Sequence, residues 1–338
     1  MSPHGRSLSR AIYAWMLFLV QWINFSQGLS ISPRQVTSRT SPPNGCLIVR
    51  ASNAQSGEFT SLQAAVNSIG SSTEPTCIFL YPGTYNERVD IRIRAPLTLY
   101  GSTVNTKDYK NNAVTINNTL GSFDAGSLDA SSTVNIRSPN VSTYNINFIN
   151  GYTAGQAVAV TANGNMTGFY GCSFKSWQDT LYAKNGWQYY SNCYIEGAVD
   201  YIFGDGSAWF GECTIASSGR GYITASSRTF DNDTARYVID HSTITSTGQS
   251  DLTGQVFLGR PWRVNARVMY QYSTLTKVVN AEGWAPMADG ATPRTFQEYQ
   301  NTGDGADTSN RKYLTPANGA VHKQDLWGKS YQWYDTSY

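Results

Sequence analysis

The chain has 338 residues, of which 40% are hydrophobic and 14% are charged, as in proteins that fold around a core. This balance argues against an intrinsically disordered chain. The formal net charge is only +2 and no cluster combines basic with aromatic residues, so nothing in the composition indicates a nucleic-acid partner.

The first residues have the pattern of a secretory signal. Arg6 and Arg10 precede the apolar run 11–20, a pattern typical of a segment that directs export and is then removed. A membrane anchor is the alternative, but Gln21 interrupts the run before it reaches the roughly 20 apolar residues that a span needs. We therefore expect a secreted, extracellular protein with no membrane partner. Four Asn-x-Ser/Thr triplets agree with export, at Asn117, Asn140, Asn165 and Asn232. The expected organisation is a signal peptide over 1–28, a Ser/Pro-rich lead over 29–44 and a single domain over 45–338.

A strand over 45–50 and a short helix over 60–69 are the first elements expected after the lead. Leu62, Val66 and Ile69 follow helical spacing, and Thr60 with Gln63 has the form of a capping box. We expect this helix to cover the apolar end of a stacked β structure, because an uncovered terminal layer would expose its strand edge. Short strands separated by turn residues are then expected over 78–81, 83–85, 89–93 and 97–100.

The five cysteines fall into two groups. Cys46 and Cys77 each begin a β-like run, and an oxidising compartment would favour a disulfide between them. Cys172, Cys193 and Cys213 recur at intervals of 21 and 20 residues, which indicates a buried stack of small side chains. No histidine or acidic cluster keeps metal-ligand spacing beside them, so we predict neither a metal site nor a cofactor.

From residue 141 onward a three-residue pattern recurs, in which two inward residues flank one outward residue. Successive copies are 26, 21, 20, 29 and 31 residues apart, so the strand is kept while the loops vary in length. This is typical of a parallel β-helix with about 20 or more residues per coil. A Greek-key sandwich is the alternative, since Asn-Gly pairs typical of hairpins occur at 150–151, 163–164 and 185–186. The copies begin at Ile146, Cys172, Cys193, Cys213, Ser242 and Ser273.

Two aspartates repeat at the interval of one coil. Asp179 and Asp200 are 21 residues apart, and Gln156 precedes Gln178 by 22. Equivalent positions in stacked coils lie about 4.8 Å apart, so these four side chains are predicted to form one polar ladder. Two solvated aspartates on a β surface are the alternative. The aromatic residues around the ladder suit either sugar rings or core packing; they are Trp177, Tyr182, Trp187, Tyr201, Phe203 and Trp262.

The residues present favour carboxylate chemistry. A serine triad is disfavoured because Gly-x-Ser-x-Gly is absent, and after the predicted signal only His241 and His322 remain. Of two neighbouring carboxyls, one tends to have a raised pKa and act as an acid while the other stays charged. Arg260, held in the loop 258–262 by glycine and proline, could pair bidentately with one aspartate.

Five ordered blocks resemble the pectin methylesterases, also called pectinesterases. They are Gly83–Glu87, Gln156–Val160, Gln178–Leu181, Asp200–Gly204 and Leu258–Trp262, and the tail 296–303 is also similar. The resemblance implies an all-β, right-handed parallel β-helix as the catalytic domain, with the 60–69 helix as its cap. It also implies hydrolysis of the C6 methyl esters of pectin (homogalacturonan), with release of methanol.

The resemblance also implies a role for each site residue. Asp200 would be the nucleophile, and Gln156 and Gln178 would donate to the oxyanion. Asp179 would act as the acid and then as the base, and Arg260 would keep Asp200 ionised. Trp262, Phe203 and Tyr182 would line the sugar cleft.

Departures from the family pattern are small. Met287 stands where a second tryptophan is often found, which would alter one cleft wall; Tyr201 and Val160 replace similar residues. The sequence resembles the short fungal or bacterial type, and we expect a monomer acting on cell-wall pectin. Two alternatives stay open at this point: another β-helical pectin enzyme such as a polygalacturonase or lyase, since paired carboxylates also serve glycosyl transfer, or a non-catalytic wall-binding protein.

Overall fold

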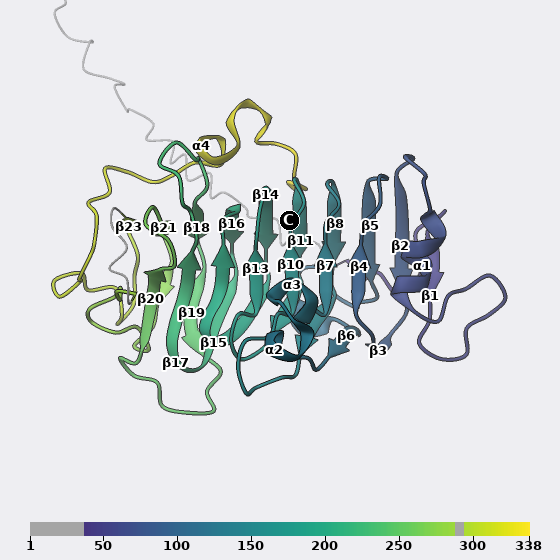
Figure 1. Ribbon diagram of the computed structural model, residues 1–338, viewed down its shortest axis with the longest axis horizontal. Helices are drawn as coiled ribbons and strands as arrows, with labels where there is room; N and C mark the ends of the chain where they lie inside the picture. Colours follow the sequence, from purple (N-terminus) through teal and green to yellow (C-terminus); the bar gives the residue numbers. More distant parts are fainter. Residues whose placement is uncertain (1–36, 288–293) are drawn as a thin grey trace, which may run out of the picture. The chain divides into compact units, whose positions relative to one another are not determined.

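The computed structural model describes residues 37–287 and 294–338; the predicted signal peptide and the start of the lead lie outside the described residues. In the described part, strands stack into two long sheets, and every pairing between two named strands is parallel (Figure 1). Parallel stacking confirms the predicted all-β, parallel β-helix and shows that the sandwich alternative is wrong.

One sheet has the order β1-β2-β5-β8-β11-β14-β16-β18-β21-β23. Its strands are β1 (Leu47–Val49), β2 (Thr76–Leu80), β5 (Leu97–Gly101), β8 (Val141–Tyr144), β11 (Thr167–Tyr170), β14 (Trp187–Ser191), β16 (Ser207–Gly211), β18 (Tyr237–Asp240), β21 (Arg267–Gln271) and β23 (Thr295–Tyr299).

The other sheet contains the path β3-β6-β9-β12-β15-β13-β10-β7-β4, and β17, β19, β20 and β22 continue it. Its strands are β3 (Gly83–Asn86), β4 (Val89–Ile91), β6 (Val114–Asn118), β7 (Val134–Ile136), β9 (Asn147–Asn150), β10 (Val160–Ala162), β12 (Ser173–Lys175), β13 (Leu181–Ala183), β15 (Tyr194–Gly204), β17 (Thr214–Ser226), β19 (Thr243–Ser246), β20 (Val256–Pro261) and β22 (Thr274–Leu275). The helices are α1 (Leu62–Ile69), α2 (Ser122–Ala125), α3 (Leu128–Ser131) and α4 (Lys323–Trp327), with 3-10 turns η1 (Tyr109–Asn111) and η2 (Gly328–Ser330).

The recurring triplets pair in register, as their spacing predicts. The last residue of each triplet points into the core, and these residues form the ladder Phe148, Phe174, Ile195, Ile215, Ile244 and Leu275. The Asn-Gly pairs do not make hairpins. Residues 163–164 and 185–186 instead turn the chain from β10 to β11 and from β13 to β14, strands that belong to different sheets.

A left-handed residue precedes each triplet, a feature that the sequence analysis did not anticipate. It bends the chain sharply from one sheet to the other, between β8 and β9 and at each equivalent point of the later coils. Six of the bends precede the triplets, at Asn145, Gly171, Asn192, Glu212, His241 and Tyr272, and a seventh, Gln300, follows β23; all seven have φ between 46° and 60° and form this row of bends.

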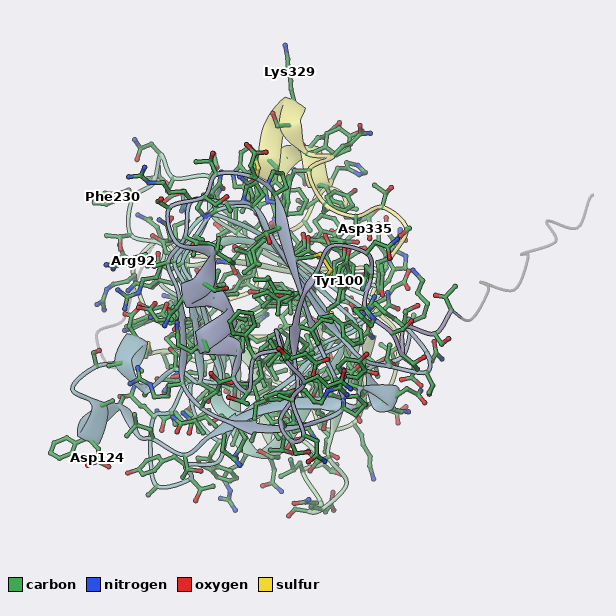
Figure 2. All side chains as sticks on the ribbon, turned by 90° about the vertical axis from the view of Figure 1, so that its right-hand side faces the viewer. Arg92, Tyr100, Asp124, Phe230, Lys329 and Asp335 are labelled. Carbon is green, nitrogen blue, oxygen red and sulfur yellow. A yellow bond between two sulfur atoms is a disulfide. The ribbon has the colours of Figure 1, made fainter. Side chains whose placement is uncertain are left out.

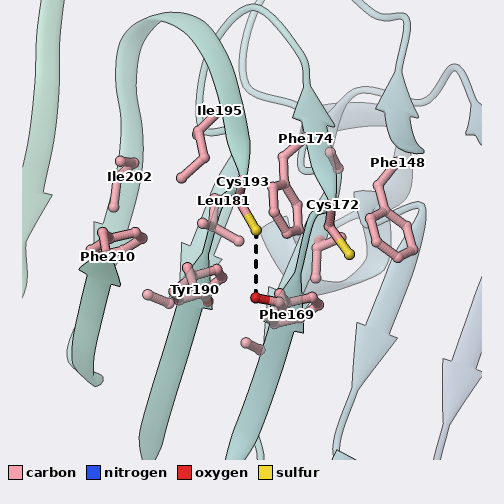
Figure 3. Close-up of a cluster of buried hydrophobic side chains, with 14 of the residues drawn as sticks. Phe148, Phe169, Cys172, Phe174, Leu181, Tyr190, Cys193, Ile195, Ile202 and Phe210 are labelled. Carbon is pink, nitrogen blue, oxygen red and sulfur yellow. Dashed lines mark hydrogen bonds between the residues drawn. The ribbon is translucent and has the colours of Figure 1, made fainter. Parts of the chain in front are cut away.

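The three unpaired cysteines lie in the core, as predicted. All are buried, and Figure 3 shows Cys172 and Cys193 among Phe169, Phe174 and other apolar side chains. The thiol of Cys193 donates to the carbonyl of Phe169, with the sulfur 3.5 Å from the oxygen. The predicted disulfide between Cys46 and Cys77 is also present.

Helix α1 lies at the β1 end of the stack (Figure 1) and buries Leu62, Ala65 and Val66, as expected of a cap. The predicted capping box is wrong. Ser61, not Thr60, accepts from the Ala64 N–H, and the Glu87 carboxylate accepts from the N–H groups of residues 62 and 63 at 2.7 and 3.0 Å. A carboxylate 25 residues away thus satisfies the free N–H groups of the first turn.

The C-terminal segment packs on the outer face of the sheet that contains β11, β14 and β16. Trp327 is buried and donates from Nε1 to the Ser207 carbonyl at 3.1 Å, and Asp335 accepts from the Tyr144 hydroxyl at 3.0 Å. Figure 2 shows Asp335 on one side of this body and Asp124, in α2, on the opposite side. The C-terminal segment and α2 therefore lie on different faces.

Candidate active site

The predicted polar ladder exists in register. Gln156 pairs with Gln178 and Gln178 pairs with Val199, so each polar residue stands one coil above the next. The N–H of Asp179 donates to the Val199 carbonyl at 3.0 Å. This pairing places Asp179 beside Asp200, the residue after Val199.

Both aspartates have left-handed backbones, with φ of 65° at Asp179 and 50° at Asp200. The pairing of β15 with β17 shifts register between Val199 and Ile202, so Asp200 lies in a bulge. Bulges and left-handed residues re-aim side chains and are concentrated at functional sites. Aspartate accepts this conformation more readily than most residues do.

Arg260 lies in β20 and reaches Asp200, in β15, across the intervening strand β17, so the loop predicted over 258–262 is wrong: pairing with β17 holds this segment as a strand. Its Nε and Nη2 atoms donate to the two carboxylate oxygens at 2.9 and 2.6 Å, the bidentate geometry that was predicted. The adjacent Gly259 is required for this approach, because a Cβ there would lie 2.0 Å from the Thr224 hydroxyl oxygen. The Arg260 guanidinium also stands 4.0 Å from the centre of the Tyr222 ring.

Asp179 is the carboxyl whose surroundings favour the protonated form. Only 3% exposed, it has a pKa raised to about 7, first by burial and then by the charge of Asp200. The Gln156 amide, which donates from Nε2 to Oδ2 at 2.7 Å, and the more distant Arg260 oppose this rise in pKa. Burial also raises the pKa of Asp200, but two direct hydrogen bonds from Arg260 counter it. The two carboxyls therefore differ in environment, since the arginine pairs directly with Asp200 but not with Asp179.

One pocket gathers most of the predicted site. Its lining residues are Leu128, Gln156, Gln178, Asp179, Asp200, Phe203, Ala225, Arg260, Trp262 and Met287. Tyr182 does not line it directly but stacks on Phe203, with ring centres 4.3 Å apart, and Phe203 in turn lies 5.8 Å from Trp262. Tyr201 is wholly buried and belongs to the core.

Leu128 and Ala225 were missed by the sequence analysis. Leu128 comes from an insertion over 119–133 that has no repeat or motif to mark it, and Ala225 follows the register of β17 with β20. Met287 lines the pocket at the position where the sequence suggested an altered wall.

Across 37–287 and 294–338, no group of three or more His, Cys, Asp or Glu residues could hold a metal ion. Within the same ranges, no helix has the length and hydrophobicity to cross a membrane.

Comparison with known proteins identifies the family. The family model described as pectinesterase matches residues 48–325. The probable pectinesterase A of Aspergillus flavus is 51% identical over 337 residues, covering 99% of this chain and 100% of the relative. The chain belongs to the pectinesterase family. As a pectinesterase it is a carboxylic ester hydrolase, which favours the esterase interpretation over a polygalacturonase, a lyase or a non-catalytic β-helix.

Other pectinesterases extend the agreement. Pectinesterase A of Emericella nidulans is 54% identical over 304 residues, covering 89% of this chain and 92% of the relative. The crystal structure of the pectin methylesterase from Aspergillus niger superposes with a TM-score of 0.86 at 52% identity, covering 89% of this chain and all of that one. The pectin methylesterase from carrot gives 0.73 at 29% identity, covering 82% and 88%.

Proposed function

We propose that the pocket removes C6 methyl esters from the galacturonate units of pectin by nucleophilic attack of Asp200. The observation that carries this assignment is the placement of an arginine-paired carboxylate, Asp200, beside a carboxyl of raised pKa, Asp179, in one pocket of a pectinesterase. The first group is suited to attack and the second to proton transfer.

In the first half-reaction, a carboxylate oxygen of Asp200 forms a bond to the ester carbonyl carbon. The carbonyl oxygen becomes an oxyanion, which Gln156 and Gln178 stabilise with amide N–H groups. Gln156 can serve both partners, because its Nε2 carries two hydrogens and Asp179 takes only one. Asp179 then gives its proton to the departing methoxide, so methanol leaves and an acyl-enzyme anhydride remains.

In the second half-reaction, the ionised Asp179 takes a proton from water, and the oxygen of that water bonds to the acyl carbon. The bond to Asp200 breaks, which restores the Asp200 carboxylate and the protonated Asp179 and releases the galacturonic acid group, whose proton then passes to solvent. Arg260 keeps Asp200 oriented and favours its charged form at the start and end of the cycle.

Phe203 and Trp262 supply a flat apolar wall suited to sugar rings, and Tyr182 supports it from behind by stacking on Phe203. Tyr182 therefore supports the sugar cleft rather than lining it.

The enzyme is proposed to act outside the cell as a monomer. Export is supported by the signal-like pattern over 1–28 and by the disulfide between Cys46 and Cys77, because disulfides persist in oxidising compartments.

The test is to incubate the enzyme with highly methylated pectin and measure methanol, chain length and unsaturated products together. We expect methanol release at constant chain length, and loss of that release in Asp200→Ala. Chain shortening or unsaturated ends without methanol would contradict the assignment.

A further inference from the structure

Asn150, the last residue of β9, fastens both ends of the insertion 119–133, which carries α2 and α3. Its side chain is buried, with 1% of its surface exposed. The Oδ1 atom accepts from the Leu120 N–H at 3.1 Å, and Nδ2 lies 3.0 Å from the Leu120 carbonyl and 2.9 Å from that of Ser131. One amide thus closes the loop of chain that forms this wall of the pocket.

The same amide reaches the segment between Gln156 and β10, since Nδ2 also lies 3.1 Å from the Val158 carbonyl. From the insertion, the Ser122 N–H donates to the carbonyl of Gln156 at 2.8 Å. Gly121 lies so close to the Tyr152 ring that a Cβ there would stand 2.6 Å from it. The insertion is therefore packed tightly against the segment 150–158.

Gln156 depends on such support. It is exposed and precedes β10, pairing with the sheet through an isolated bridge to Gln178. Its amide must nevertheless stay within hydrogen-bonding distance of Asp179, where it now lies at 2.7 Å.

We propose that Asn150 is a positioning residue that acts through the insertion 119–133: it fixes Ser122, Ser122 holds the Gln156 backbone, and the Gln156 amide is thereby aimed at Asp179 and the oxyanion. This inference rests on the proposed role of Gln156. Because the insertion also carries Leu128 into the pocket, its displacement alters substrate binding as well as turnover.

Asn150→Ser is the first test. Displacing a catalytic group by about 1 Å can lower a rate by up to about 10²-fold, so we expect kcat to fall about 10-fold or more. Because the hydrogen bond from Gln156 lowers the pKa of Asp179, its loss should also move the alkaline limb of the kcat/KM profile to higher pH. The other charged groups acting on Asp179 are Asp200 and Arg260, which the variant leaves in place.

Asn145→Ser is the matched control. Asn145 is another fully buried amide, which donates to the Thr106 carbonyl at 3.0 Å and accepts from Arg39 at 2.6 Å, away from the insertion. Its loss should lower thermal stability without moving the alkaline limb.

Ser122→Pro removes the N–H that donates to the Gln156 carbonyl. It is the second test, and it replaces the first if Asn150→Ser does not fold. Ser122 is the first residue of α2, where proline is favoured, and Gly121 already has φ −76° and ψ 154°, the conformation required before proline. We expect a smaller fall in kcat, the same shift of the alkaline limb and little change in Tm. Unchanged kcat and pH profile in this variant would overturn the proposal.

A double-variant cycle separates this inference from the proposed function. If Gln156→Ala keeps wild-type activity, the proposed role of Gln156 fails. If Gln156→Ala is impaired, Asn150→Ser should add little further loss of kcat in that background, because its effect on kcat passes through Gln156, whereas an effect on KM through Leu128 would remain. Equal fold-losses in both backgrounds would overturn the positioning role and leave the catalytic one standing.

Discussion

Two sets of left-handed residues run along this β-helix, and they differ in what their side chains do. The row of bends contains asparagine, glycine, glutamate, histidine, tyrosine and glutamine, and the side chain of Gln300, for example, is exposed. The pair in the pocket contains only aspartates, which are 3% and 7% exposed. One backbone conformation thus turns the chain at the bends, where the residues differ in type, and aims two buried carboxyls in the pocket.

Among the variants that compare the pocket with the row of bends, Asp179→Asn should lose the most activity. Asparagine accepts the left-handed backbone, but it cannot transfer a proton, and loss of a general acid and base costs about 10² to 10⁴ in rate. Methanol release from methylated pectin should fall by that factor while far-UV circular dichroism is unchanged. A rate within threefold of wild type would remove Asp179 from the mechanism.

Arg260→Lys should lower kcat by roughly 10²-fold, because an ammonium cannot hold both oxygens of Asp200. Arg260 also lowers the pKa of Asp200, so weaker pairing should raise that pKa and move the acid limb of the kcat/KM profile to higher pH. A pH series of initial rates checks both effects. An unmoved acid limb would show that Arg260 does not control the charge of Asp200.

The free energy of unfolding should depend on pH because of the buried carboxyl of Asp179. Burial raises the pKa of Asp179 to about 7 in the folded state, against about 3.9 when unfolded, so the folded state retains a proton that the unfolded state loses between these values. The contribution of Asp179 to the free energy of unfolding is therefore fully present below about pH 4 and is lost as the pH rises to about 7.

Asp179→Asn does not titrate, so it should become more stable than wild type by on the order of 2 to 4 kcal/mol at pH 8, with little difference at pH 4. Urea unfolding at the two pH values measures this. A difference that does not change with pH would contradict the raised pKa.

Gln300→Asn is expected to have the smallest effect, from the row of bends. Asparagine tolerates φ of 49° better than glutamine does, so the free energy of unfolding should rise by about 0.5 to 1 kcal/mol with no change in kcat. Thermal unfolding and the methanol assay together check this. A loss of activity would show that the bends are coupled to the pocket.

The site could be predicted where it follows the period of the coil. The interval of 22 residues from Gln156 to Gln178 and that of 21 from Asp179 to Asp200 place these side chains in adjacent layers. The pairing of Arg260 with an aspartate was also predicted, but the loop expected around it is wrong, because Arg260 lies in strand β20. The triplets predicted the sheet register for the same reason, since each coil repeats one inward position.

The remaining features depend on contacts that have no period. Glu87 caps α1 from 25 residues away, which a local capping box could not reveal. Leu128 enters the pocket from an insertion of irregular sequence, which Asn150 holds by hydrogen bonds to backbone carbonyls. Because every residue has a backbone carbonyl, such bonds cannot be predicted from the residue types of the insertion. The row of bends was hidden because the exposed residues along it vary.

The most direct measurement of the central claim is methanol release by Asp200→Asn. This variant keeps the size of the side chain and tolerates the left-handed backbone, but it has no carboxylate to attack the ester. With a Tm close to that of the wild type, its rate on methylated pectin should fall more than about 10³-fold. A folded Asp200→Asn protein that releases methanol within tenfold of the wild-type rate would show that Asp200 is not the nucleophile.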